Sequence, residues 1–172
     1  MSFDSTGDRI LEPLRANSIT KTVFGIASTV GDFSIIWHAT GLIYAIGSMQ
    51  RFHQAIALSI ALGAESIIVN QGVKRIFRRE RPTVSGDDRF DVRTPSTSSF
   101  PSGHASSATF AAMILISMTG LPLAILWLVM AGIVALSRVV VRIHHLSDIV
   151  GGVVTGAILG AIAVPIISSI IG

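Results

Sequence analysis

The sequence contains no cysteine and little charge. The lack of cysteine excludes disulfide bonds, a thiol nucleophile and cysteine-ligated zinc, and it leaves the redox compartment undetermined. Only 13% of the 172 residues are charged, whereas a soluble domain carries about 25%. Half of the residues are hydrophobic, and long stretches carry no charge at all. This composition predicts an integral membrane protein with several helical spans.

The N-terminus lacks the pattern of a secretory signal peptide. The segment MSFDSTGDRILEPL is acidic and has no basic region followed by an apolar core. Residues 4–31 instead alternate apolar and polar side chains at helical spacing. This pattern predicts one or two amphipathic helices in the membrane interface, with a short first span as the alternative. We therefore expect a single membrane domain over residues 1–172, with an interfacial segment at 1–31.

Long apolar stretches predict an all-α fold, an integral membrane helical bundle of about five transmembrane helices. The second predicted span continues as a basic helix to about Arg79. The polar segment 80–103 is too long for an ordinary connection, and we expect it to be an active-site loop. The expected spans are residues 33–49, 53–73, 104–120, 122–141 and 148–171.

Counting membrane crossings places the polar clusters on one side of the bilayer. The second span ends at Lys74–Arg81, the third starts at His104, the fourth ends at Ser137–Arg142, and the fifth starts at Asp148. We call this side the motif face. Adding or removing a span before residue 53 does not change the result.

The residue types on the motif face favour an anionic ligand. Arginine forks and a lysine point charge suit phosphate, and backbone N–H groups at a helix start, here Ser102 and Gly103, also favour an anion. Because so many cations would repel a metal ion, we expect no metal and no cofactor. In a membrane chain such cations mark a headgroup site rather than nucleic acid. The cations are Lys74, Arg75, Arg78, Arg79, Arg81, Arg138 and Arg142.

Two adjacent histidines precede Asp148, and only one is well spaced for it. His144 and Asp148 are four residues apart, which places them on one face of a helix. A carboxylate on one ring nitrogen fixes the tautomer and aims the other nitrogen outward. Histidine can then act as a nucleophile or an acid near neutral pH. His145 is rotated by about 100° and is the poorer partner.

Three segments resemble the motifs of the type 2 phosphatidic acid phosphatase (PAP2) superfamily. KRIFRRERP, Lys74–Pro82, resembles the first motif, KxxxxxxRP. PSGH, Pro101–His104, resembles the second, and SRVVVRIHHLSD, Ser137–Asp148, resembles the third, SRxxxxxHxxxD. All three are intact, in order, and on the motif face.

The resemblance implies a metal-independent membrane phosphatase that acts on a lipid phosphate of the cell envelope while the lipid tail stays among membrane lipids. His144 would attack phosphorus and form a phosphohistidine, with Asp148 orienting it. His104 would protonate the leaving oxygen and then activate water. The candidate substrate is a phosphomonoester or a diphosphate of a lipid, either a polyprenyl phosphate, a polyprenyl-linked sugar phosphate or a glycerophospholipid phosphate. The phosphoryl oxygens would be held by Lys74, Arg81, Ser102, Gly103 and Arg138.

Other interpretations remain open for the site and for its surroundings. One is a vanadium haloperoxidase-like oxidoreductase, which the spans and small size disfavour. Another is a non-catalytic phosphate-binding membrane subunit or transporter, which intact His104, His144 and Asp148 disfavour. The cations outside the motif positions are expected only to attract headgroups or set topology; these are Arg75, Arg78, Arg79 and Arg142.

Two features lie within the predicted spans themselves. Glu65 precedes Lys74 by nine residues, about 900° of helix rotation, so we expect it to face away and to pack through a hydrogen bond. Gly152, Gly156 and Gly160 form a small-residue ladder on the last span. Packing within the chain is the favoured interpretation, and a homodimer is the alternative.

Charge distribution predicts the orientation in the plasma (inner) membrane. Of the thirteen Lys and Arg, only Arg51 falls opposite the motif face if the N-terminal segment does not span. The positive-inside rule then puts the motif face in the cytoplasm. The resemblance favours the opposite orientation, because many bacterial relatives work on the outer side of the plasma membrane. We favour a cytoplasm-facing site on a multi-pass protein.

Overall fold

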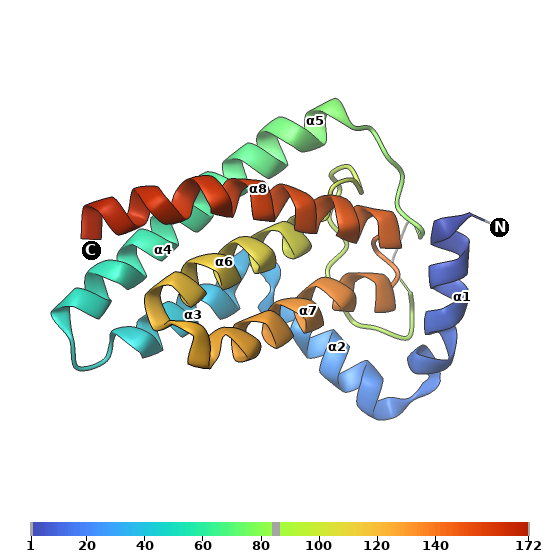
Figure 1. The fold of residues 1–172 in the computed structure, drawn as a ribbon. Helices are drawn as coiled ribbons and strands as arrows, with labels where there is room; N and C mark the ends of the chain where they lie inside the picture. The colour runs from blue at the N-terminus through green and yellow to red at the C-terminus, as the bar shows by residue number, and fades with distance from the viewer. Residues whose placement is uncertain (1, 84–86, 172) are drawn as a thin grey trace.

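The computed structural model describes residues 2–83 and 87–171, and within these ranges every regular element is helical (Figure 1). The prediction of an all-helical bundle is therefore confirmed. The main helices are α1 (Phe3–Ala16), α2 (Ser18–Val30), α3 (Ile35–Ala45), α4 (Met49–Ile67), α5 (Lys74–Ile76), α6 (Gly103–Thr119), α7 (Ala124–Val140) and α8 (Leu146–Ile171). Short elements join them: η1 (Asp32–Ser34), a π-helical turn η2 (Ile68–Val73) and η3 (Leu121–Leu123).

Three continuous helical stretches are long and apolar enough to cross a membrane: Met49–Ile76, Leu121–Val140 and Leu146–Ile171. A fourth crossing results if α2 and α3, which bend by 68° at η1, count as one broken span. α6, which has 17 residues, follows the stretch Met49–Ile76 in the chain and precedes Leu121–Val140. α2 packs against α7 and forms the first arm of this bent pair. The expectation of an interfacial segment at residues 1–31, with a short first span as the alternative, stays a prediction.

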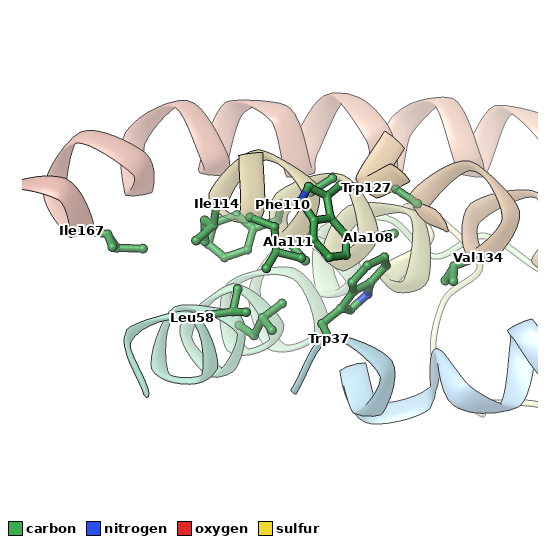
Figure 2. Close-up of a cluster of buried hydrophobic side chains, with 13 residues drawn as sticks. Trp37, Leu58, Ala108, Phe110, Ala111, Ile114, Trp127, Val134 and Ile167 are labelled. Carbon is green, nitrogen blue, oxygen red and sulfur yellow. The ribbon is translucent and has the colours of Figure 1, made fainter. Parts of the chain in front are cut away.

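α6 lies at the centre of the bundle and organises the main hydrophobic core (Figure 2). Its residues Ala108, Phe110 and Ala111 are buried, and Trp37 of α3 and Trp127 of α7 pack on them. α6 is apolar around most of its circumference, as expected of a helix surrounded by others. Small alanines let its neighbours approach closely, so the first turn of α6 is held in place at the motif face.

The glycine ladder of α8 faces α6 of the same chain. A Cβ atom at Gly152 would lie 2.8 Å from the Ala105 side chain, and one at Gly156 would meet the backbone of Ser106. Gly160 is likewise closed off by Met113. The expected close packing within the chain is what the structure shows. A homodimer through these glycines would require this face to be free, and α6 covers it.

α1 is fastened to the motif end of the bundle by one buried arginine. The Arg15 side chain donates hydrogen bonds from Nε to Val140 O and from Nη2 to Val139 O, both 3.0 Å long. These carbonyls belong to the last turn of α7, where the regular helical donors run out, and Val139 O also accepts from Arg142 N–H at 3.1 Å. Asp8 and Glu12 pair with the same guanidinium at 2.7 and 2.8 Å. Because Arg15 is fully buried, α1 is a fixed part of the motif face.

The basic helix ends earlier than the sequence predicts. α5 stops at Ile76, and Phe77 is extended, with φ −103° and ψ 115°. The chain then runs beside residues 98–99, where Arg79 O accepts from Ser99 N–H at 2.9 Å. Pro82 disfavours helical geometry only at Arg81, the residue directly before it, so the helix ends earlier than the proline requires. The early end turns Arg79 and Arg81 back toward the bundle instead of out along a helix.

Candidate active site

Residues from all three motif segments meet at one cavity of about 360 Å³ at the motif end of the bundle. Lys74 comes from the end of the α4–α5 stretch, Gly103 and His104 from the first turn of α6, and Arg138 from the last turn of α7. His144 enters from the turn between α7 and α8. Segments that are far apart in the sequence thus surround one polar space.

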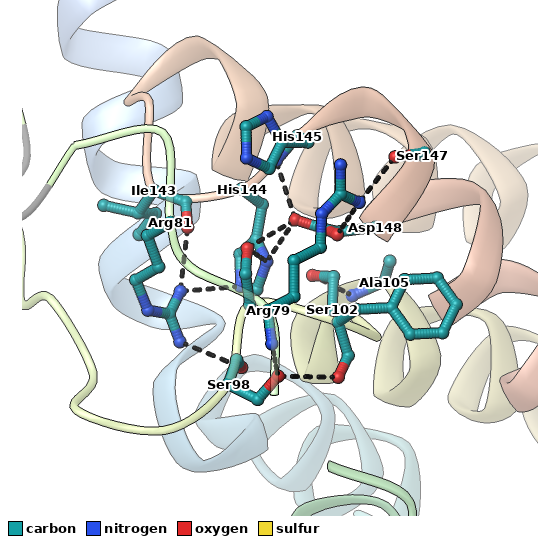
Figure 3. Close-up of polar contacts among 12 residues, drawn as sticks. Arg79, Arg81, Ser98, Ser102, Ala105, Ile143, His144, His145, Ser147 and Asp148 are labelled. Atoms are coloured by element: carbon teal, nitrogen blue, oxygen red, sulfur yellow. Dashed lines mark hydrogen bonds and ion pairs between the residues drawn. The ribbon is translucent and has the colours of Figure 1, made fainter. Parts of the chain in front are cut away.

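His144 is only 2% exposed and contacts a group on each side of its ring. Nδ1 lies 3.4 Å from Asp148 Oδ2, and Nε2 lies 3.2 Å from Arg81 Nη1 (Figure 3). Since Nδ1 faces a carboxylate, the network assigns the proton to Nδ1 and leaves the lone pair on Nε2. Burial lowers the pKa of His144 to about 3, and nearby cations act in the same direction. His144 is therefore a neutral imidazole at physiological pH.

Asp148 is completely buried and is held by several donors besides His144. Oδ2 accepts from Ser99 Oγ at 2.5 Å and from the His145 backbone N–H at 2.8 Å. The Asp148 carboxylate is thereby fixed in the geometry that orients His144. His145 contributes through its backbone, as expected for the residue with the poorer side-chain geometry.

Arg79 and Asp4 form part of this network, and the sequence analysis did not predict either role. Arg79 Nη1 donates to Asp148 Oδ1 at 2.5 Å and to Ser147 Oγ at 2.7 Å, while Nη2 reaches Asp4 Oδ2 at 2.7 Å. Asp4 also accepts from Ser147 N–H at 2.9 Å, at the start of α8. Partial burial alone would raise the pKa of Asp4, but hydrogen bonds from Ser147 and Arg79 lower it overall. The N-terminal helix is thus connected to the histidine–aspartate pair.

Replacing Arg79 with Gln is expected to lower kcat roughly 10- to 100-fold, because the charge-assisted bond that positions Asp148 is lost. Asp4→Asn should give a smaller loss, and the double variant should be no worse than Arg79→Gln alone. The measurement is kcat and KM for phosphate release. Arg78→Gln is the matched control, since this neighbouring arginine is exposed. Equal losses in Arg78→Gln and Arg79→Gln would contradict a positioning role for Arg79.

Two buried N–H donors of Arg138 have no partner among the residues that the structure describes. The side chain is 1% exposed, and Nη1 donates to Ser28 Oγ and to Ser28 O. Nε and Nη2 make no hydrogen bond there. Unpaired buried donors are costly, and Arg138 lines the cavity together with the buried ammonium of Lys74. Such an arrangement is suited to oxygens of a bound phosphate.

The two anion-site candidates of the PSGH segment, Ser102 and Gly103, have different roles in the structure. Gly103 lines the cavity, and a Cβ there would lie 3.5 Å from Lys74 Nζ. Ser102 instead caps α6: its Oγ accepts from Ala105 N–H at 3.4 Å, and its own N–H donates to Asp148 O at 3.0 Å. Ser102 does not line the cavity. Its polar groups are engaged in starting α6 and in joining it to α8.

His104 is paired with a carboxylate that the sequence analysis did not select. His104 Nε2 lies 3.1 Å from Asp32 Oδ1 and 3.1 Å from Ser28 O. Two acceptors on Nε2 assign the proton to that nitrogen and leave Nδ1 for the cavity. Asp32 lies in η1, where Phe33 and Ser34 both adopt positive φ. The one sequence feature that marks Asp32 is that it is the only acidic residue between Glu12 and Glu65.

Glu65 faces the same cavity as Lys74, which corrects the expectation that it faces away. The π-helical turn Ile68–Val73 lies between them. A π turn has more residues per turn, so the rotation across this segment is smaller than that of an ideal α-helix. The expected packing bond is present, because Ser106 Oγ donates to Glu65 Oε1.

Comparisons with known proteins agree with this geometry. Residues 54–170 match the family model of the PAP2 superfamily. The decaprenylphosphoryl-5-phosphoribose phosphatase of Mycobacterium tuberculosis (strain ATCC 25618 / H37Rv) is 39% identical over 136 residues, which cover 78% of this chain and 73% of that protein. The protein of the same name from Mycolicibacterium smegmatis is 42% identical over 127 residues, covering 73% and 67%.

Two solved structures share the fold. A transmembrane PAP2 type phosphatidylglycerolphosphate phosphatase from Bacillus subtilis has a TM-score of 0.66 at 22% identity, covering 96% of this chain and 86% of that one. LpxE of Aquifex aeolicus has a TM-score of 0.76 at 20% identity, covering 96% of both chains. The similarity therefore extends from the motif segments to nearly the whole helical bundle. The chain belongs to the PAP2 superfamily and is an integral membrane phosphatase that acts on a lipid phosphate.

Proposed function

We propose that this phosphatase removes the terminal phosphate of a polyprenyl-linked sugar phosphate through a phosphohistidine intermediate. Two observations together carry the mechanism. His144 is neutral and its Nε2 lies beside Arg81, and Arg138 has buried N–H donors with no partner among the described residues. The substrate class is supported by the two mycobacterial relatives, each named as a phosphatase of a decaprenylphosphoryl sugar phosphate.

The reaction proceeds in two steps. His144 Nε2 attacks phosphorus and forms the P–N bond, while the bond to the leaving oxygen breaks. That oxygen takes a proton from Nδ1 of His104, which enters the step as an imidazolium whose Nε2–H stays bonded to Asp32. Lys74, Arg81, Arg138 and the backbone of Gly103 hold the charged phosphoryl oxygens. Water then attacks the phosphohistidine and gives its proton to His104, which releases phosphate and restores both histidines.

A substrate panel tests this function directly. The purified protein in lipid vesicles with excess EDTA should release phosphate from decaprenylphosphoryl-5-phosphoribose with a kcat/KM at least about tenfold above the other lipids, a difference of about 1.4 kcal/mol. The other lipids are decaprenyl phosphate, decaprenyl diphosphate, phosphatidic acid and phosphatidylglycerophosphate. Preference for any of these would reject the sugar-phosphate class. Loss of activity in EDTA would reject the metal-independent mechanism.

The motif face is proposed to face the cytoplasm of a bacterial plasma membrane. Arg15 and Asp4 anchor α1 at the motif end. The Lys and Arg residues of the N-terminal segment therefore lie on the motif face in the positive-inside count, and of the described Lys and Arg residues only Arg51 lies near the opposite end. In this cysteine-free chain, Asp88→Cys should resist an impermeant maleimide in intact cells and react after lysis. Gln50→Cys, exposed at the opposite end, is the matched control and should label in intact cells. The reverse pattern would place the motif face outside.

A further inference from the structure

The position of the two histidines determines where the leaving group of the substrate must lie. In phosphoryl transfer the attacking and leaving atoms are roughly in line through phosphorus. His144 is on one side of the phosphate site, and His104 is the proton donor on the other. If the proposed function is correct, the rest of the substrate extends past His104, toward η1.

The cavity wall on that side is polar and comes from three segments. Asp32 and Ser34 come from η1, Asn70 and Gln71 from the π-helical turn of the α4–α5 stretch, and Arg93 from the active-site loop. Amide and hydroxyl groups at such a wall can bond the hydroxyls of a sugar. Among these residues only Arg93 offers a positive charge to the leaving group.

Arg93 is held in place by an aromatic ring rather than by a carboxylate. Its guanidinium carbon lies 5.0 Å from the centroid of the Phe33 ring. Phe33 is 75% exposed and has a φ of 53°, an unusual conformation for a bulky residue. The ring therefore stands at the cavity mouth instead of in the core, and there it supports the arginine.

The remaining contacts of Arg93 leave its donors available. Among residues 2–83 and 87–171, no hydrogen bond or ion pair of the Arg93 side chain is found, whereas Arg89 of the same loop pairs with Asp87 and Glu12. Asp32, the carboxylate on the same wall, bonds to His104 instead. Stacking on a ring uses the flat face of the guanidinium. The N–H groups at the edge of the guanidinium therefore stay available to bind an anion.

We propose that Arg93, stacked on Phe33, binds a second, non-scissile phosphate group of the substrate. This group is the phosphodiester that joins the sugar to the polyprenyl chain, one sugar unit beyond the scissile phosphate. Arg93 thereby selects lipids that carry two phosphates separated by a sugar over lipid monophosphates. The proposal rests on the proposed function and extends it to a specificity residue outside the three motifs.

A second basic groove gives an internal control for this assignment. It has a volume of about 750 Å³ and includes Arg75, Arg78 and Arg81 in its lining. Arg81 contacts His144 Nε2, so this groove adjoins the nucleophile and not His104. The in-line requirement places the leaving group away from it. Arg78 is therefore a nearby exposed arginine that should not contribute to the second phosphate site.

The test compares two soluble ligands as competitive inhibitors of p-nitrophenyl phosphate hydrolysis. Ribose 1,5-bisphosphate carries a second phosphate where the sugar would join the lipid, and ribose 5-phosphate does not. The wild-type inhibition constants should favour the bisphosphate by about tenfold. Arg93→Gln and Phe33→Leu should reduce this ratio toward one, and Arg93→Lys should restore part of it. Arg78→Gln should keep the wild-type ratio.

Each outcome decides a different claim. A ratio near one in the wild-type protein, or a wild-type ratio that persists in Arg93→Gln, overturns the second phosphate site. Loss of the ratio in Arg78→Gln alone moves that site to the other groove and also overturns the proposal for Arg93. Failure of the wild-type protein to hydrolyse any phosphate ester overturns the proposed function itself. With the lipid substrate, Arg93→Gln should raise KM rather than lower kcat.

Discussion

Substitution of His144 by Gln should reduce phosphate release by roughly 10³-fold or more and should abolish the covalent intermediate. The reason is that His144 Nε2 faces the phosphate site while Asp148 fixes Nδ1. Glutamine fills a similar space but has no nucleophilic ring nitrogen. The measurement is phosphate release together with trapping of the enzyme, labelled by a radioactive substrate, in an alkaline detergent quench. A trapped intermediate should be acid-labile and base-stable, as a phosphohistidine is.

His145→Gln is the matched control for this experiment. The contact of His145 with the site runs through its backbone N–H, which the substitution keeps. Activity should therefore remain within about threefold of wild type, under 1 kcal/mol. Full activity in His144→Gln, or a labelled intermediate in that variant, would reject His144 as the nucleophile. Since burial lowers the pKa of His144 to about 3, its protonation should not produce the acid limb of kcat/KM near neutral pH.

Substitution of His104 by Gln should have an effect that depends on the leaving group. An alkyl leaving group such as a sugar hydroxyl needs a proton, so formation of the phosphoenzyme should slow by about 10²- to 10⁴-fold. p-Nitrophenolate leaves without a proton, so its burst should be nearly intact and followed by slow turnover. Rapid-quench and stopped-flow measurements of the first turnover distinguish the two steps. An equal loss on both substrates would argue against an acid role for His104.

Asp32→Asn tests whether the bent segment positions His104. We expect the same dependence on the leaving group with a smaller size, about tenfold on the alkyl substrate, because one charge-assisted bond to His104 Nε2 is weakened. Asp91→Asn, an exposed carboxylate of the active-site loop, is the matched control. A structural defect would instead lower the first turnover of both substrates by the same factor.

Much of the site was predictable because its signals are local. The spacing of His144 and Asp148 is four residues in any helical or turn geometry, and the apolar stretches between motifs determine how many times the chain crosses. Convergence of the motif clusters followed from those crossings alone. The roles of His144, His104, Asp148 and the phosphate ligands remain predictions that the experiments above test.

Contacts between distant segments were not predictable in this way. Arg79 looked like one of several surface cations, and only the early end of α5 turns it onto Asp148 and Asp4. Asp32 lies between the expected interfacial segment and the first expected span, and the 68° bend between α2 and α3 brings it to His104. Ser102 and Gly103 are neighbours in the sequence, yet only Gly103 lines the cavity.

The sequence by itself determined the all-helical membrane class, the three motif segments and their arrival at one end of the bundle, since these depend on composition and short-range spacing. The tertiary structure decided which cation pairs with which carboxylate, that Glu65 lines the cavity, and that the Arg93 guanidinium stacks on the Phe33 ring. These features depend on a helix end, a π-helical turn and a bend. Such irregularities change where a side chain points without leaving a periodic pattern in the sequence.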